Sequence, residues 1–162
     1  MKIAHYTLLF VAAMIATPVF PQGKPAVDKP ADNMQILREK LKADKKLVVA
    51  ANMDLTEAEA KGFWPLYEEY QKELQKINDR LATAIVAYAK EYNAKSLTDD
   101  KATKLLDEAL AVEESETKLK RASVPKLSKV LPGRKVARYV QIENKIRAIV
   151  KYEIAAEVPL AP

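Results

Sequence analysis

Cysteine is absent from the 162-residue sequence, and the one histidine, His5, lies close to the N-terminus. Without cysteine no disulfide framework can form, so packing alone must hold the fold together. A nucleophilic triad built on cysteine or histidine is excluded after residue 5, and so are the usual ligands of zinc and other borderline metals. We therefore predict a protein that is not an enzyme and that has neither a metal site nor a cofactor.

Glycine is also scarce, with three residues at Gly23, Gly62 and Gly133. An all-β protein usually needs more glycine for turns with positive φ. The sequence has no phosphate-binding glycine loop and no Asp-rich calcium loop with a turning glycine. The charged residues, 30% of the chain, are mostly Lys and Glu, which are good helix formers. The composition therefore favours an all-α fold.

Charges of both signs alternate along the chain, and the formal net charge is +5. A basic chain can contact nucleic acid or anionic lipid, but alternating charges favour an ordinary solvated surface, and we expect no nucleic-acid partner. Adjacent acids such as Glu68 and Glu69 stand beside lysines. A glycosidase-type pair needs a pocket that fixes the separation of its carboxyl groups, so a solvated face is again the favoured interpretation.

Residues 1–21 are predicted to be a signal peptide that directs export to the periplasm. Lys2 and His5 precede an apolar run over residues 7–20. This run is shorter than the ~20 residues that span a bilayer, and it fits a signal-peptide core. The cleavage site is weak, because Pro21 stands where a small residue is expected. Retention as an uncleaved membrane anchor is the alternative, and we expect membrane contact only in that case.

Residues 22–33 contain prolines and little apolar surface, and they are predicted to be a flexible linker. A helical domain follows over residues 34–157, and residues 158–162 form an irregular tail. The first helix is predicted over residues 34–51. Its apolar positions are Ile36, Leu37, Leu41, Leu47 and Val48, and its exposed face holds Arg38, Lys40, Lys42, Lys45 and Lys46.

The second helix, from Thr56 to Tyr92, opens with a predicted capping box. Thr56 can cap the free N–H groups, while Glu59, three residues later, reaches back to the start of the helix. A narrow apolar stripe with spacings of 3 and 4 follows at Ala60, Phe63, Tyr67, Tyr70, Leu74, Ile77, Leu81, Ala84 and Tyr88. The helix would be ~55 Å long at 1.5 Å per residue, so it needs a partner of similar length.

The third helix is predicted to be that partner. It begins near Thr98, the expected N-cap, and Asp99 and Asp100 suit the positive end of the helix dipole. The connection over residues 92–96 is short enough to make the two helices a long antiparallel hairpin. The apolar stripe of this helix is weaker and is interrupted by an acid; it runs Ala102, Leu105, Ala109, Val112, Glu116, Leu119 and Ser123.

The fourth helix is predicted over residues 132–156, with Pro132 at the first helical position. Its apolar residues cover more than one stripe, which indicates more than one neighbour. They are Val136, Tyr139, Val140, Ile142, Ile146, Ile149, Val150 and Ile154. Pro65 should be absorbed as a bend in the second helix, and Pro125 should bend or break the third helix near its end. We therefore expect a curved, thin, all-α fold of four helices.

The candidate contact residues are aromatic and basic. Trp64 lies beside the apolar stripe of the second helix, where it either covers the core or stays partly exposed. Arg134, Lys135 and Arg138 precede Tyr139, which places cations beside an aromatic ring. These five residues are the candidate site for an acidic or unfolded client. The alternative is that the long basic side chains cover the core and keep their charges in water.

Two short segments resemble a known family. Residues 55–59 (LTEAE) are similar to the LTxxQ motif of the CpxP/Spy family, and residues 130–135 (VLPGRK) stand where that family repeats the motif before its last helix. Glu59 replaces the motif glutamine, which preserves capping. Pro132 and Lys135 replace the threonine and the glutamine of the second motif, which departs further from the family pattern.

The resemblance covers roughly residues 34–156 and includes the order of signal peptide, short helix, long hairpin and final helix. It implies a periplasmic homodimer shaped as a curved, thin cradle. Similar proteins act without ATP: some hold unfolding clients, some modulate envelope-stress sensors, and some sense metals through His ligands that this chain lacks. The resulting hypothesis is a chaperone-like protein for unfolded or stress-exposed clients. The alternatives are a regulatory partner of an envelope-stress sensor and, third, a structural or anchored envelope protein.

Overall fold

The computed structural model describes residues 45–162, and within this range every regular element is a helix. Residues 45–53 are helical, and they are followed by α2 (Glu57–Asn93), α3 (Asp99–Leu127) and α4 (Gly133–Glu157). The predicted all-α fold with four helices is therefore confirmed for this part of the chain. The predicted signal peptide, the linker and residues 34–44 of the first predicted helix lie outside the described residues.

α2 begins with the predicted capping box. The Thr56 hydroxyl accepts a hydrogen bond from the backbone N–H of Glu59 (3.3 Å), and the Glu59 carboxylate accepts one from the backbone N–H of Thr56 (2.8 Å). The reciprocal bonds satisfy two of the N–H groups that the first turn of a helix leaves free. The helix then continues through Pro65 to Asn93.

α3 and α4 differ in how they start. Thr98 caps α3, because its hydroxyl accepts a hydrogen bond from the backbone N–H of Lys101 (3.4 Å). Pro125 lies inside α3, and the helix ends two residues later at Leu127. The prediction for α4 is wrong by one residue: Pro132 is the N-cap, and Gly133 is the first helical residue. Pro132 has an extended backbone, and its side chain makes no cap. Its carbonyl accepts hydrogen bonds from the backbone N–H groups of Lys135 and Val136 in the first turn.

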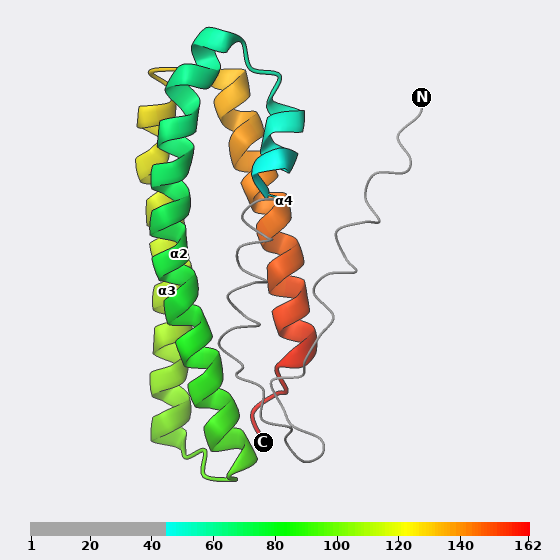
Figure 1. Cartoon of the computed structure of the whole chain (residues 1–162). Helices are drawn as coiled ribbons and strands as arrows, with labels where there is room; N and C mark the ends of the chain where they lie inside the picture. Colours follow the sequence, from blue (N-terminus) through cyan, green and yellow to red (C-terminus); the bar gives the residue numbers. More distant parts are fainter. Residues whose placement is uncertain (1–44) are drawn as a thin grey trace.

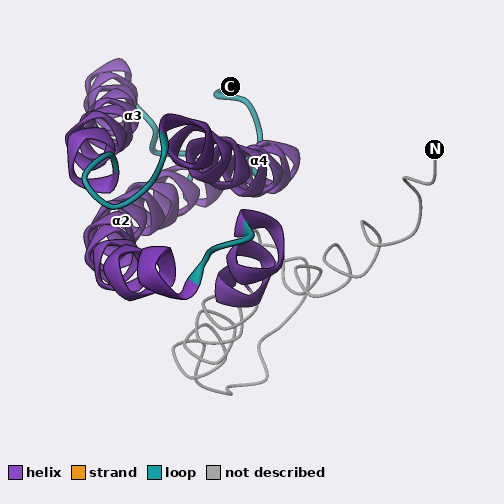
Figure 2. Cartoon of the chain, turned by 90° about the horizontal axis from the view of Figure 1, so that it is seen from above, coloured by secondary structure: helices purple, strands orange, loops and turns teal. Residues whose placement is uncertain are grey.

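The three long helices lie roughly along one axis, and successive helices run in opposite directions. α2 and α3 lie side by side and are joined by residues 94–98, whereas α4 starts close to them and diverges towards its C-terminal end (Figure 1). Hydrogen bonds between side chains show the relative direction of α2 and α4. Contacts from α2 to α4 advance together along both helices, from Gln71–Glu143 to Asn78–Arg147, so these helices are parallel. Viewed from above, the 45–53 helix lies beside the start of α2 (Figure 2).

The apolar core lies at the end of the molecule where α4 begins. Its largest members are aromatic, and the ring of Tyr139 packs edge-on against Phe63, Tyr67 and Tyr70 with centroid distances of 5.1, 6.2 and 5.9 Å. The smaller members are Val49, Met53, Leu127, Leu131 and Val136. The predicted stripe of α2 therefore faces the core at its first turns, and α4 supplies the central ring.

The predicted inward face of the first helix needs correction. Leu47, assigned there as an apolar position, is 68% exposed, whereas Val49 and Met53 are fully buried. Residues four apart share one face of a helix, so the buried face runs through Lys45, Val49 and Met53. Met53 lies beyond the predicted helix end, and Lys45 was assigned to the exposed face. The register of this face is set by contacts with α2 and α4, which local periodicity does not contain.

A close approach of α2 to the loop after α3 depends on a glycine. A Cβ added at Gly62 would lie 2.9 Å from both Cβ and Cγ1 of Val130. We expect Gly62→Ala to lower the free energy of unfolding by about 1–3 kcal/mol through overpacking, offset by up to ~1 kcal/mol of better helix propensity. Urea denaturation followed by circular dichroism measures the difference.

The matched control is Gly133→Ala, because a Cβ there meets nothing within 4 Å. This variant should be as stable as the natural chain or slightly more stable. Val130→Ala in the Gly62→Ala background should recover part of the loss. A Gly62→Ala variant as stable as Gly133→Ala would contradict the packing described for this contact.

Candidate functional site

Trp64 covers one side of the aromatic core. Its ring packs edge-on against Phe63 (5.0 Å between centroids) and Tyr67 (5.4 Å), and it remains partly exposed. Lys46 from the 45–53 helix places its ammonium 5.2 Å from the centre of the Trp64 ring, and it also pairs with Glu68 (2.6 Å). Trp64 thus lies between the core and the Lys46 ammonium, which is attracted to the electron-rich face of the indole ring.

The other four candidate residues do not form one surface. Arg134 and Arg138 are exposed, whereas Tyr139 is 1% exposed and belongs to the core. Lys135 points towards the start of α2, where its ammonium donates to the Glu59 carboxylate and to the carbonyl of Asp54, each at 2.6 Å. Two of the predicted contact residues are therefore engaged inside the fold, and the two arginines remain available to a partner.

Lys135 links the first turn of α4 to the capping box of α2. The hydrogen bond from the Lys135 ammonium is the largest effect that lowers the pKa of Glu59, and the backbone N–H of Thr56 adds to it. Both donors favour the ionised carboxylate. Asp54, which supplies the second acceptor for Lys135, has a φ of 46° in the turn before α2. Aspartate tolerates this left-handed conformation better than most residues.

A buried carboxylate, Glu143, joins three helices below the aromatic core. It is 4% exposed, and it accepts hydrogen bonds from the ammonium of Lys45 (2.7 Å) and the amide of Gln71 (2.9 Å). The same Gln71 amide donates to the Tyr139 hydroxyl (3.3 Å). Burial lowers the pKa of Lys45, while Glu143 acts in the opposite direction. Burial also raises the pKa of Tyr139, so its hydroxyl stays protonated.

A second buried carboxylate, Glu116, ties α3 to α4. It is 3% exposed and pairs with the guanidinium of Arg147. Arg147 also donates to the side-chain oxygen of Asn78 on α2 (2.9 Å), and burial lowers its pKa. The sequence indicated Glu116 only as an interruption of an apolar stripe. Its partner lies on another helix, so no local pattern could have identified the pair.

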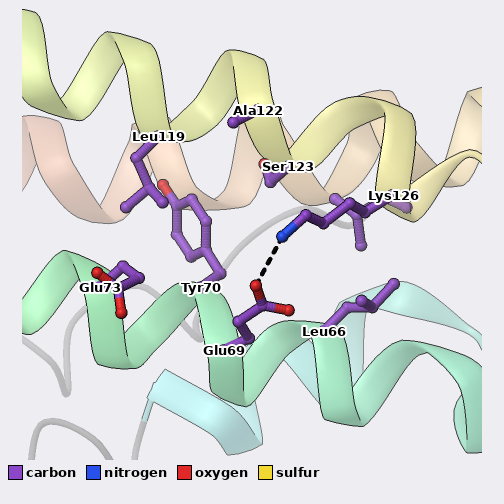
Figure 3. Close-up of a pocket in the computed structure, with 9 residues that line it drawn as sticks. Leu66, Glu69, Tyr70, Glu73, Leu119, Ala122, Ser123 and Lys126 are labelled. Carbon is purple, nitrogen blue, oxygen red and sulfur yellow. Dashed lines mark hydrogen bonds and ion pairs between the residues drawn. The ribbon is translucent and has the colours of Figure 1, made fainter.

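The cavity between α2 and α3 is too small for a metabolite. Its volume is about 40 Å³, whereas sites for small molecules are roughly 300–1,000 Å³. Tyr70 and Leu119 line its wall, and Lys126 crosses its rim to pair with Glu69 at 2.6 Å (Figure 3). Within residues 45–162 no group of three or more His, Cys, Asp or Glu side chains is placed to hold a metal ion.

Large apolar side chains lie exposed on the outer faces of the helices. Leu106 and Leu110, one turn apart on α3, are 58% and 53% exposed, and Val86 on α2 is 63% exposed. On α4, Ile149 and Tyr152 are 43% and 76% exposed. Ile149 was predicted as an inward position. The predicted stripe of α3 passes through Leu105 and Ala109, which leaves Leu106 and Leu110 off it, and this could have been recognised from the sequence.

Comparison with known proteins adds no relative: the chain matches no protein-family model, no curated protein and no solved structure. The similarity to the CpxP/Spy family therefore stays a prediction from the motif and the order of helices. Among the described helices, none combines the length and the apolar character that a bilayer span requires.

We expect the Lys45–Glu143 pair to be strongly coupled. Replacing one partner, in Lys45→Met or Glu143→Leu, leaves the other charge buried and should cost about 3–5 kcal/mol of stability. The double variant should recover much of that loss, because an apolar pair of similar size needs no charge compensation. Urea denaturation of the four proteins gives the coupling free energy.

The exposed pair Lys151–Glu113 is the matched control, with 45% and 59% of its side chains exposed. The same substitutions there should change stability by about 1 kcal/mol or less. Additive losses at Lys45 and Glu143 would show that the two groups do not share one buried site.

The lowered pKa of Glu59 predicts a dependence of stability on pH. Its folded pKa lies below the usual 4.5, so the unfolded chain takes up the proton first as pH falls. The stabilisation from Glu59 is then complete at neutral pH and is lost as the pH falls through the folded pKa. The difference in melting temperature between the natural chain and Glu59→Gln should therefore shrink below about pH 4.5.

Glu57→Gln serves as the control, because Glu57 lies in the same turn and forms no ion pair with any residue in 45–162. Its melting temperature should follow the acid profile of the natural chain more closely. A constant difference between the natural chain and Glu59→Gln from about pH 7 to about pH 3 would contradict the assigned sign.

Proposed function

We propose that this chain is a periplasmic, ATP-independent, chaperone-like protein that holds unfolded or stress-exposed clients on its outer surface. The observation that carries the proposal is the exposed pair Leu106–Leu110 on α3. Two adjacent leucines on an outer face cost solubility and do not contribute to the core, so a role in contact with another protein accounts for them. The motif and helix order that resemble the CpxP/Spy family point to the same activity.

The thinness of the fold supports the proposal. Over residues 78–93 of α2 and 99–111 of α3, one residue, Ala89, is buried. The apolar side chains of these segments therefore stay partly exposed to solvent. Contact with another protein surface would bury them further. We also propose that two copies associate as a curved, thin homodimer, built on the pairing of α2 and α3 as one long hairpin.

Mixed charges around the leucines suit weak and adaptable binding. Asp107 and Glu108 lie between Leu106 and Leu110 in the sequence, and Glu108 is held by Arg80 from α2 (3.0 Å). Such a surface offers short apolar contacts within a polar rim, which favours many partners over one tight partner. Client binding of this kind uses no bond-making chemistry and needs no nucleotide.

We expect the protein to suppress aggregation of a chemically unfolded model client without ATP, measured by light scattering at equimolar concentrations. Leu106→Ser/Leu110→Ser should weaken the effect by about tenfold or more, because each exposed leucine contributes roughly 1 kcal/mol of contact. Both positions are exposed, so the variant should keep the circular dichroism spectrum and melting temperature of the natural chain.

Leu160→Ser is the matched control, since Leu160 is 90% exposed in the tail beyond α4. This variant should suppress aggregation as well as the natural chain. Two results would overturn the proposal: no suppression by the natural chain, or saturable binding to one sensor ectodomain together with no binding to unrelated unfolded proteins. The second result would favour the regulatory alternative.

A further inference from the structure

α4 carries a straight basic stripe on the face turned away from the core. We define the basic stripe as six exposed residues with helical spacing: Arg134, Arg138, Gln141, Lys145, Ile149 and Tyr152. Successive members lie three or four positions apart, so they share one face of the helix. The opposite face holds Val136, Tyr139 and Glu143, which are all buried. From first to last the stripe is ~27 Å long.

Within residues 45–162, the cations of the basic stripe have no acidic partner. Many exposed lysines elsewhere are paired, such as Lys46 with Glu68 and Lys126 with Glu69. In contrast, Arg134, Arg138 and Lys145 form no ion pair with any residue in the range 45–162. The stripe itself contains no Asp or Glu. Three like charges in one line, with no acid among them, attract an anionic partner.

We propose that the basic stripe binds the surface of a membrane that contains anionic phospholipid, which goes beyond the expectation from the sequence that membrane contact requires an uncleaved N-terminal segment. A line of side chains on the convex surface of one helix can lie against a flat surface such as a membrane, but it does not form a concave pocket. The guanidinium groups of Arg134 and Arg138 match phosphate oxygens in a two-pronged geometry. The ammonium of Lys145 adds a third attraction to the headgroup layer.

The position of the apolar members favours a membrane over an acidic protein. A protein interface usually places its apolar anchors at the centre, inside a polar rim. Here the centre of the stripe is Gln141 and Lys145, and the apolar side chains Ile149 and Tyr152 stand at one end. Tyrosine is enriched at the boundary between headgroups and acyl chains, because its ring is apolar and its hydroxyl is polar. Leu160, 90% exposed, follows just beyond this end of α4.

This proposal does not rest on the proposed chaperone function. Client capture was assigned to Leu106 and Leu110 on α3, whereas the membrane contact uses α4. The interaction should be weak and reversible, because each cation near an anionic surface contributes about fivefold in affinity and three contribute about a hundredfold. It should also disappear at about 1 M salt, where the screening length falls to ~3 Å.

The test is co-sedimentation of the full chain with vesicles. Neutral phosphatidylcholine vesicles are compared with vesicles in which about a third of the lipid is phosphatidylglycerol. We expect stronger binding to the anionic vesicles, and we expect salt to remove the difference. Comparing the two vesicle types separates the stripe from apolar binding by any other segment, because such binding is similar on both.

Two variants locate the effect. Arg134→Gln/Arg138→Gln/Lys145→Gln should lose the preference for anionic vesicles by about a hundredfold. Lys61→Gln/Lys95→Gln/Lys104→Gln removes the same charge from exposed positions on α2, the α2–α3 turn and α3, and it should bind like the natural chain. A loss of equal size in this control would overturn the proposal, because net charge alone would then explain binding.

Tyr152→Ala distinguishes a membrane from an acidic protein. Tyr152 is 76% exposed, so the variant should fold normally and bind anionic vesicles more weakly, with no change in binding to soluble polyglutamate. Equal binding of the natural chain to neutral and anionic vesicles would overturn the proposal. So would binding to polyglutamate as tight as binding to anionic vesicles at the same salt concentration, which would identify an acidic protein as the partner class.

Discussion

The structure depends on two carboxylates that have been taken out of water. Glu143 and Glu116 are 4% and 3% exposed, and an isolated charge at such a depth would cost several kcal/mol. Each is compensated by a cation from a different helix, Lys45 for Glu143 and Arg147 for Glu116. Because each pair joins two helices, the pairs link α4 to the 45–53 helix and to α3. The apolar contacts alone would tolerate several alternatives.

This polar layer also connects the helices where apolar packing is sparse. The aromatic cluster and the smaller core residues packed with it lie at one end, where α4 begins. Further along, α4 diverges from α2 and α3 (Figure 1), and long side chains bridge the wider separation, as in Lys120–Asn144 and Lys151–Glu113. The result is a fold that is closely packed at one end and connected mainly by polar bonds at the other.

Local features of the fold were predictable from sequence, and distant pairings were not. The cap residues Thr56, Glu59 and Thr98 act on backbone groups within three residues, so their letters are sufficient. The alternation of 3 and 4 in α2 placed Phe63, Tyr67 and Tyr70 correctly for the same reason. Lys45, the partner of Glu143, lies 98 residues away along the chain. From the sequence alone, a charged residue among apolar positions is equally consistent with a surface position.

The candidate surface residues show the same contrast between local and distant interactions. Arg134 and Arg138 proved exposed, as long cations usually are. Tyr139 entered the core, and Lys135 turned to the capping box, because the N-terminus of α2 presents acceptors that the local sequence of α4 does not contain. The leucines Leu106 and Leu110 were recognisable as lying off the stripe of α3. Their exposure is known only from the structure, in which both leucines are more than half exposed within residues 45–162.

The register of α4 has a consequence for local opening of the chain. Because Arg147 lies level with Asn78 and the carbonyl of Pro159 accepts a hydrogen bond from Tyr88 (2.9 Å), α4 ends before α2 does. The last turn of α2, residues 94–98 and the first turn of α3 therefore form a tip of two helices beyond the third. With so few buried contacts, this tip should open at a lower free energy than the aromatic end, so its amide protons should exchange with solvent sooner. The aromatic end, where the buried residues gather, should exchange later.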